Sequence, residues 1–193
     1  ALKSDIKVID ITADFDANEA IVIDRSITIN GKGNTLTSSY NRVINFTAPE
    51  INVEINDWSF ISTAARNGQN GPRGLNIWGP EVHDAILTFN NCSVDFTDPS
   101  ANDWTYAINC GVNENNTITI NGGTYEGANV VNVWGANHTI TIDGAVLTSL
   151  YQPSSAYYGF CVSLQEAENS KATIKNSTLN SVHAKAFGST TKN

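Results

Sequence analysis

The chain has 193 residues, of which 40% are hydrophobic and 16% are charged, so it can build one sizeable core in one or at most two domains. Eleven basic residues against 19 acidic ones give a formal net charge of −8, which argues against non-specific binding to nucleic acid or to an anionic membrane surface. No apolar run approaches the roughly 18 residues of a membrane span, and nothing at the N-terminus resembles a signal peptide. The absence of methionine predicts a processed protein or an excised fragment.

The first predicted element in chain order is a strand or partial rung at residues 6–12, which would cover the open end of a repeat core. Beyond residue 20 a short pattern recurs: an apolar, a polar and an apolar residue, then a polar turn residue and one that tolerates a positive φ. Its six copies lie at residues 27–31, 53–57, 87–91, 118–122, 140–144 and 172–176. One apolar residue follows each copy: Leu36, Phe60, Val94, Tyr125, Leu147 and Leu179.

A second pattern, apolar–polar–apolar, alternates with the first along the chain. Its copies lie at residues 44–46, 75–77, 108–110, 131–133, 162–164 and 184–186. The distance from this pattern to the next copy of the first is nearly constant, about 10–13 residues, whereas the distance in the other direction varies from about 11 to 21. A constant arc and a variable loop indicate a coil that climbs one rung per repeat, with parallel strands about 4.8 Å apart. The sequence therefore predicts an all-β parallel β-helix of about six complete coils.

One stretch carries a family resemblance as well. Residues 20–37 resemble the opening rungs of right-handed β-helix proteins of the pectate-lyase superfamily, and most closely the pectate-lyase-like adhesive domains of bacterial cell-surface proteins. Most of the likeness lies in the run Asn30-Gly31-Lys32-Gly33-Asn34-Thr35-Leu36. The resemblance implies a right-handed solenoid and an extracellular, cell-surface location in a larger bacterial protein. We expect a single domain over residues 1–193, with an N-terminal cap at 1–19 and repeat coils at 20–190.

Stacked coils turn equivalent positions into columns. The outward column of the first pattern consists of Thr28, Glu54, Thr88, Thr119, Thr141 and Thr173, and threonine is a good strand residue that ladders well between parallel neighbours. The column at the following turn consists of Asn30, Asn56, Asn90, Asn121, Asp143 and Lys175. Asparagine side chains stacked in this way are expected to bond one another.

The outward column of the second pattern is harder to interpret, because asparagine is a poor strand residue. It consists of Asn45, Asn76, Asn109, Asn132, Ser163 and Lys185, and two residues further along come Thr47, Trp78, Gly111, Trp134, Gln165 and Phe187. Two interpretations stay open. The amides form a second structural ladder, or they form a sugar-binding surface in which Trp78 and Trp134 are apolar platforms for a pyranose ring.

The variable loops favour the sugar-binding interpretation. They lie at residues 62–73, 95–105, 126–129 and 149–158, and the third of them is almost absent. Its absence predicts a saddle over Asn132 and Trp134, since loops on one face of a solenoid commonly carry function. The expected walls of the saddle are Trp104, Tyr106, Tyr151, Tyr157 and Tyr158. The competing role of these rings is packing beneath the loops or over the core ends.

No catalytic constellation is visible. Glycoside hydrolysis needs two carboxylates, and among the predicted outward strand positions only Glu54 carries one. Lysis of an acidic polysaccharide needs an acidic calcium site and a basic residue. Lys185, Arg66 and Arg73 could supply the base, and Asp95, Asp98 and Asp103, which share one loop, are weak candidates for Ca²⁺. The three histidines form no ligand set, and Cys92, Cys110 and Cys161 are expected to be buried, unpaired thiols. None of the catalytic residues of pectate lyases can be carried over.

We therefore expect a non-catalytic, extracellular module that binds a polysaccharide or a host glycan or glycoprotein, with no cofactor unless Ca²⁺ binds, no nucleic-acid partner and no membrane insertion. The expected contact residues are Asn76, Trp78, Trp104, Tyr106, Asn109, Asn132, Trp134, Tyr151, Tyr157 and Tyr158. One alternative is a polysaccharide lyase or glycoside hydrolase whose catalytic groups come from loops. Another is a structural stalk or tailspike segment.

Overall fold

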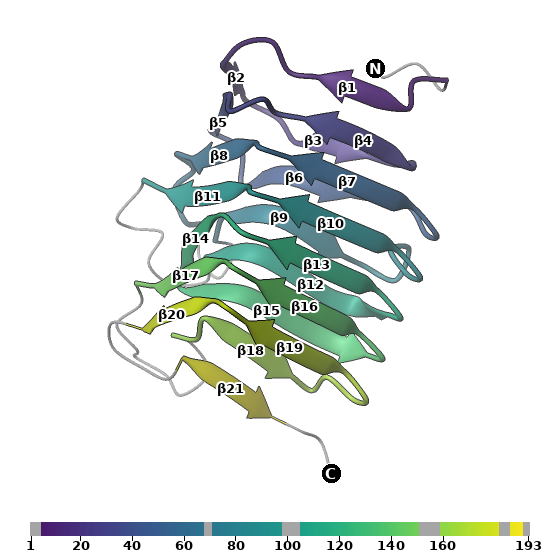
Figure 1. The fold of residues 1–193 in the computed structure, drawn as a ribbon, viewed down its shortest axis with the longest axis vertical. Coiled ribbons are helices and arrows are strands. Elements are labelled where there is room, and N and C mark those ends of the chain that lie inside the picture. Colours follow the sequence, from purple (N-terminus) through teal and green to yellow (C-terminus); the bar gives the residue numbers. More distant parts are fainter. Residues whose placement is uncertain (1–4, 68–70, 98–104, 151–158, 182–185, 191–193) are drawn as a thin grey trace.

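The computed structural model describes residues 5–67, 71–97, 105–150, 159–181 and 186–190, and its strands form three parallel sheets of seven strands each (Figure 1). Sheet A contains β1 (Val8–Asp10), β4 (Ile27–Asn30), β7 (Asn52–Asn56), β10 (Ile86–Asn90), β13 (Thr117–Asn121), β16 (Thr139–Asp143) and β19 (Lys171–Lys175). Sheet B contains β2 (Phe15–Ala17), β5 (Thr35–Ser38), β8 (Ser59–Ser62), β11 (Ser93–Phe96), β14 (Thr124–Gly127), β17 (Val146–Ser149) and β20 (Thr178–Ser181). Sheet C contains β3 (Ile21–Ile23), β6 (Arg42–Phe46), β9 (Arg73–Trp78), β12 (Tyr106–Glu114), β15 (Asn129–Ala136), β18 (Val162–Gln165) and β21 (Phe187–Thr190).

Each coil adds one strand to sheet A, one to sheet B and one to sheet C before the chain climbs to the next rung. The fold is thus a right-handed parallel β-helix, and this prediction from the sequence is confirmed. The strand register also confirms the predicted threonine column of sheet A, in which each member stands directly opposite the next from Thr28 to Thr173.

The predicted asparagine ladder at the end of sheet A is present as well. Asn56 Nδ2 donates to Asn30 Oδ1 at 3.0 Å, and Asn90 Nδ2 donates to Asn56 Oδ1 at 2.7 Å. Asn121 Nδ2 continues the ladder to Asn90 Oδ1 at 2.8 Å. We call this set the A ladder; its side chains are half-buried or exposed, so water reaches them.

The corner between sheets A and B is tight because, from the second coil onward, one or two residues there adopt a positive φ. Asp57 and Asn91 have φ values of 48° and 50° there, a conformation that Asn and Asp tolerate better than most residues. In the fifth coil two glycines occupy the corner, and Gly123 has a φ of 85°. A Cβ at Gly123 would overlap the carbonyl oxygen of Cys92, so only glycine fits.

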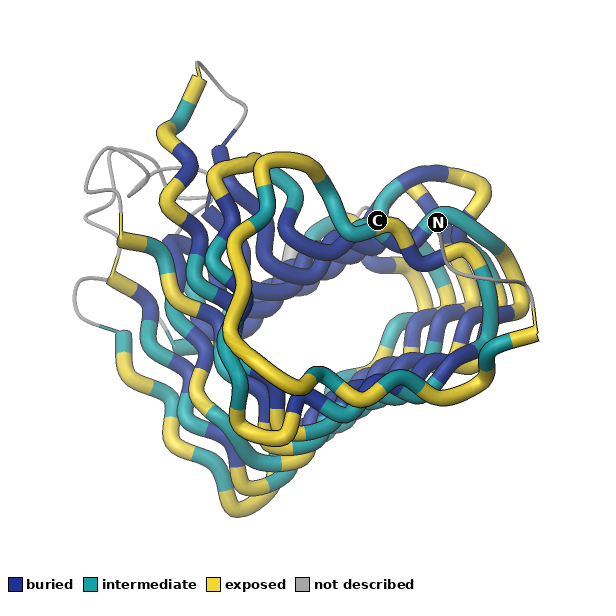
Figure 2. Tube along the Cα trace, turned by 90° about the horizontal axis from the view of Figure 1, so that it is seen from above, coloured by how far each residue is buried: buried dark blue, intermediate teal, exposed yellow. Residues whose placement is uncertain are grey.

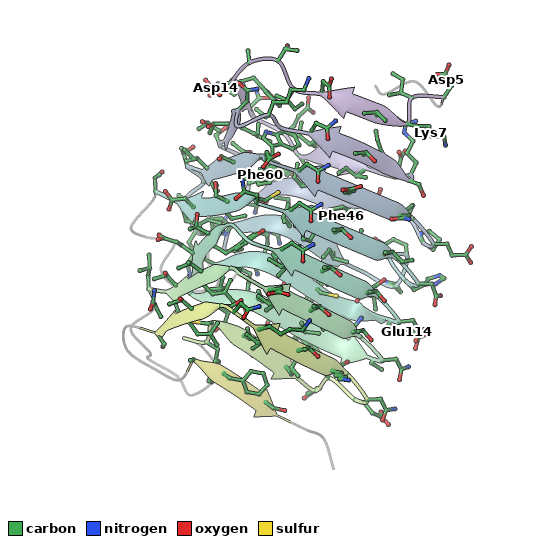
Figure 3. The ribbon with its side chains drawn as sticks, viewed as in Figure 1. Asp5, Lys7, Asp14, Phe46, Phe60 and Glu114 are labelled. Carbon is green, nitrogen blue, oxygen red and sulfur yellow. The ribbon has the colours of Figure 1, made fainter. Side chains whose placement is uncertain are left out.

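The core is a stack of apolar side chains between the three sheets. Phe46 from β6 and Phe60 from β8, both labelled in Figure 3, are 0% and 1% exposed. Phe46 contacts Phe89 at a ring-centroid distance of 6.2 Å, and Trp58 contacts Phe60 at 4.7 Å. Figure 2, which looks down the stack from the N-terminal end, shows the alternation of buried and exposed positions repeated from coil to coil.

Three details differ from the expectation. Sheet B is a full sheet, where the sequence indicated only one apolar residue per coil, such as Leu36. The N-terminal segment was expected to supply one strand, and β1 lies in that place. The segment also supplies β2, so β1, β2 and β3 together form a complete first coil. The last strand of sheet C is β21, not residues 184–186, and it places Phe187 opposite Val162 and Gly188 opposite Ser163. Lys185 lies outside the described residues.

Candidate functional site

The outward asparagines of sheet C form a ladder of their own. Asn76 Nδ2 donates to Asn45 Oδ1 at 2.7 Å, Asn109 Nδ2 to Asn76 Oδ1 at 3.0 Å, and Asn132 Nδ2 to Asn109 Oδ1 at 3.1 Å. We call this set the C ladder. Unlike the A ladder it is buried, since Asn76 is 5% exposed and Asn109 and Asn132 are 3% exposed.

This burial decides between the two interpretations of the column. A buried amide that bonds its neighbours cannot reach a ligand in solvent, and it stabilises the stack because buried polar groups need partners. The expectation that Asn76, Asn109 and Asn132 contact a ligand is therefore corrected: the contacts support the structural ladder.

Two tryptophans lie beside the C ladder on the outer face of sheet C. Trp78 and Trp134 stand on either side of Gly111 in the strand register. A Cβ at Gly111 would lie 2.5 Å from Trp78 Cζ3, so the ring of Trp78 occupies the space above the glycine. The two indole rings meet edge to face, with centroids 6.0 Å apart and planes at 77°. Trp134 is 41% exposed and Trp78 is half-buried. We call Trp78, Gly111 and Trp134 the tryptophan platform.

A strained backbone residue adjoins the platform. The register between β12 and β15 shifts after Gly111, so Val112 is an extra residue that bulges outward. Val112 has a φ of 57° and is 50% exposed. A β-branched residue in the left-handed region is a true outlier that costs about 1–3 kcal/mol, and such outliers cluster at functional sites.

Beneath the bulge lies a buried histidine. His138 is 1% exposed, and its Nδ1 accepts a hydrogen bond from the backbone N–H of Asn116 at 3.2 Å. Burial lowers the pKa of His138 below its usual 6.5, while a backbone contact at Asn113 opposes part of that shift. The ring is neutral at pH 7 and supports the strand ends rather than a ligand.

The predicted walls of the saddle are described only in part. Tyr106 is 6% exposed, and the guanidinium of Arg73 lies over its ring at 4.1 Å from the centroid. Burial raises the pKa of Tyr106, and the charge of Arg73 offsets part of the rise. Tyr106 is thus a packed residue, which corrects its assignment as an exposed wall. Trp104, Tyr151, Tyr157 and Tyr158 lie outside the described residues. The short connection itself is present, because only Ala128 separates β14 from β15.

The acidic residues show a pair that the sequence did not reveal. Asp95 and Glu126 occupy outward positions on β11 and β14, and the pairing of Val94 with Tyr125 places them on adjacent rungs. Burial raises the pKa of Glu126, and the charge of Asp95 raises it further. The expectation that Glu54 is the only carboxylate at an outward strand position is therefore wrong, because β11 and β14 of sheet B supply two more.

The remaining predicted groups do not converge. Asp98 and Asp103, candidates for Ca²⁺ with Asp95, lie outside the described residues, and within the described part of the chain no three His, Cys, Asp or Glu side chains are placed to hold a metal ion. All three cysteines are free and buried, as predicted. Burial raises the pKa of Cys92 to about 11 and that of Cys110 to about 12, so neither is a nucleophile near neutral pH.

A shallow groove of about 570 Å³ also runs along the corner between sheets A and B, and Lys32, Asp57, Ser93 and Thr124 are among its lining residues. Sequence reasoning missed it because it depends on sheet B. Several of its members are polar side chains, and some bond one another within the corner, such as Asn91 Nδ2 to Asp57 Oδ1 at 2.8 Å.

The described residues contain no helix long and apolar enough to cross a membrane. Comparison of the chain with protein-family models, with curated proteins and with solved structures finds no match to any of them.

Proposed function

We propose that this chain is a non-catalytic, extracellular β-helix module that binds carbohydrate through the tryptophan platform, within a larger bacterial surface adhesin related to the pectate-lyase superfamily. The observation that carries the proposal is the platform itself: two indole rings on the outer face of sheet C, next to a coil with almost no loop. The resemblance of residues 20–37 supports the family and the location.

The chemistry of the platform suits a pyranose ring. A sugar offers an apolar face of C–H groups, and rigid aromatic side chains bury such a face at low entropic cost. Trp134 is 41% exposed, which corresponds to roughly 80 Å² of a side chain that buries 150–250 Å². Covering this area contributes about 2 kcal/mol at 25 cal/mol per Å², or roughly a 30-fold change in Kd.

The test is a glycan array followed by titration of the best ligand, using tryptophan fluorescence. Trp134→Ala should weaken binding roughly 30-fold, and Trp78→Ala should weaken it as well because Trp134 loses its edge-to-face neighbour. Tyr40→Ala is the matched control, since Tyr40 is an aromatic residue of similar exposure, 44%, outside the platform. Binding that is unaffected by Trp134→Ala, or the absence of any glycan ligand, would remove the proposal.

A second candidate, a glycoside hydrolase or polysaccharide lyase, is favoured by the Asp95–Glu126 pair. Adjacent rungs lie about 4.8 Å apart, near the roughly 5–5.5 Å separation of the carboxyl groups in retaining glycosidases. Glu126, with its raised pKa, would be the acid and Asp95 the nucleophile. Incubation with neutral and acidic polysaccharides, with and without Ca²⁺, distinguishes the functions: new reducing ends lost in Glu126→Gln identify a hydrolase, and unsaturated products absorbing in the ultraviolet identify a lyase.

A further inference from the structure

The middle coils contain acidic residues and no lysine or arginine. Residues 74–170 include ten Asp or Glu, of which eight lie in the described part of the chain, and all the Lys and Arg residues lie outside this span. The tryptophan platform is within it, on β9, β12 and β15. A surface with one sign of charge attracts ligands of the opposite sign and repels those of its own. The platform therefore lies in a field that favours cations.

One carboxylate lies against the strand end that carries Trp78. Gly79 follows Trp78 and has a φ of 116°. A Cβ on Gly79 would lie 2.5 Å from Glu81 Oε2 and 2.6 Å from Glu81 Oε1, so the carboxylate of Glu81 packs on this glycine. The backbone N–H of Gly79 donates in turn to the carbonyl oxygen of Gly111 at 3.1 Å. Gly79 thus places the carboxylate of Glu81 beside the part of the platform that Trp78 and Gly111 form.

A second carboxylate lies at the same edge of sheet C, one rung further along. Glu114 ends β12 and stands opposite Ala136, two residues after Trp134. At sheet spacings of about 3.3 Å per residue and 4.8 Å between strands, the Cα atoms of Glu114 and Trp134 lie roughly 8 Å apart. The side chain of Glu114 is exposed at the side of the stack (Figure 3). A ligand that covers the indole of Trp134 therefore comes within reach of this carboxylate.

These two carboxylates are not neutralised by the protein. No ion pair within the described residues includes Glu81 or Glu114. Glu166 follows Gln165, the residue opposite Trp134 in β18, and continues the acidic edge to a third rung. Salt screens a single surface charge readily, but several charges of one sign along one edge act together on a ligand.

An aromatic face bordered by carboxylates suits an ammonium group. A cation within about 6 Å of an indole centroid is attracted by the ring, and tryptophan is the best aromatic residue for this contact. A carboxylate beside the ring accepts charge-assisted hydrogen bonds from the same ammonium group. A neutral sugar gains the apolar contact alone, and the carboxylate of an acidic sugar is repelled by the edge. The platform and its acidic edge together therefore favour a positively charged sugar.

We infer that the tryptophan platform selects a cationic glycan, built of amino sugars with free amines, whose ammonium groups contact the indole of Trp134 and the carboxylates of Glu81 and Glu114. The indoles hold the C–H face of the sugar ring, and the acidic edge holds its amine. The inference rests on the proposed function, because it names the ligand class of the same site.

Oligosaccharides that differ only at nitrogen give the sharpest test. At pH 6 a hexamer of glucosamine carries ammonium groups, its N-acetylated counterpart is neutral, and a hexamer of galacturonic acid is anionic. In titrations followed by tryptophan fluorescence, the Kd of the glucosamine hexamer should be roughly tenfold below that of the N-acetylated hexamer, since two exposed charge contacts contribute about two- to fivefold each. The galacturonic acid hexamer should bind most weakly. The preference should shrink as salt rises from 0.05 to 0.5 M and disappear at pH 9, where the amines are neutral.

Variants separate this inference from the proposed function. Glu81→Gln combined with Glu114→Gln should abolish the preference for the amine and leave binding of the N-acetylated hexamer unchanged, because both indoles remain. Asp16→Asn removes an exposed carboxylate from β2 of sheet B and is the control that should keep the preference. Trp134→Ala should weaken binding of both hexamers.

The outcomes are distinct. A strongest ligand that is neutral or anionic, yet depends on Trp134, would leave the proposed function standing and overturn the inference. A preference for the amine that survives the double glutamine variant would overturn it as well. If no glycan binds in a way that depends on Trp134, the proposed function and the inference both fail.

Discussion

The two asparagine ladders make a quantitative prediction about buried amides. Asn109 in the C ladder makes two inter-rung hydrogen bonds, at 3.0 and 3.1 Å. Asn90 in the A ladder makes three, at 2.7, 2.8 and 3.0 Å, the last of them to Glu54. A count of bonds alone predicts that loss of Asn90 costs more stability.

Burial reverses that order. Asn109→Ala leaves Asn76 Oδ1 and Asn132 Nδ2 without partners in a site where no residue is more than 5% exposed, and each stranded group costs about 1–3 kcal/mol. The expected loss in the free energy of unfolding is about 2–5 kcal/mol. After Asn90→Ala, water replaces the lost bonds of the half-buried A ladder, so the expected loss is about 1 kcal/mol.

The measurement is equilibrium unfolding in guanidinium chloride, followed by far-ultraviolet circular dichroism. Both variants should keep the wild-type slope while their midpoints fall by different amounts. Equal midpoints for the two variants, or a larger loss for Asn90→Ala, would refute the argument that burial rather than bond count sets the contribution of a ladder.

Three further predictions follow from other buried or strained groups. Because burial raises the pKa of all three thiols, a thiol reagent at pH 8 should label none of them in the folded protein and all three in denaturant; rapid labelling of the folded protein would contradict their burial. Burial lowers the pKa of His138 in the folded state. Its contribution to stability is therefore complete above the unfolded pKa of about 6.5 and is lost as the pH falls through the folded pKa. The difference in the free energy of unfolding between the wild type and His138→Gln should shrink from pH 7.5 to pH 5, and His83→Gln, at a half-exposed histidine, is the control. Val112→Gly should raise the free energy of unfolding by about 1 kcal/mol because it removes the strain of a positive φ. Val112→Ala keeps a Cβ and should not raise the free energy of unfolding; equal effects of the two variants would show that φ is not the cause.

Sheets A and C could be predicted from the sequence because their strands alternate apolar and polar residues, with threonine or asparagine between two core residues. Sheet B could not, because its inward positions pair one apolar residue with a small polar one. In β5 these are Leu36 and Ser38, and in β17 they are Leu147 and Ser149, and all four are buried. A buried serine conceals the period of two, so the Asp95–Glu126 pair was missed with its sheet.

The direction of a side chain was predictable, but its exposure was not. The alternation along β9 and β12 correctly places Asn76 and Asn109 on the outer side of sheet C. Whether an outward side chain is exposed to solvent depends on which side chains and loops cover it, and the local alternation of residues carries no such information. Trp134 was correctly expected at the surface because its strand neighbour Gly111 is too small to cover it.

The direction of the hydrogen bonds has a mechanical consequence. β1 and β21 lie at opposite ends of the stack, and the bonds between rungs run along the axis that joins those ends (Figure 1). A load pulling the ends apart therefore acts along these bonds and opens them one after another, as a zipper opens, instead of shearing a whole sheet at once. Each coil released, about 22 residues at its shortest, frees roughly 70 Å of extended chain from a rung that occupied about 4.8 Å of the stack. We therefore expect the molecule to lengthen under tension by unfolding one coil at a time.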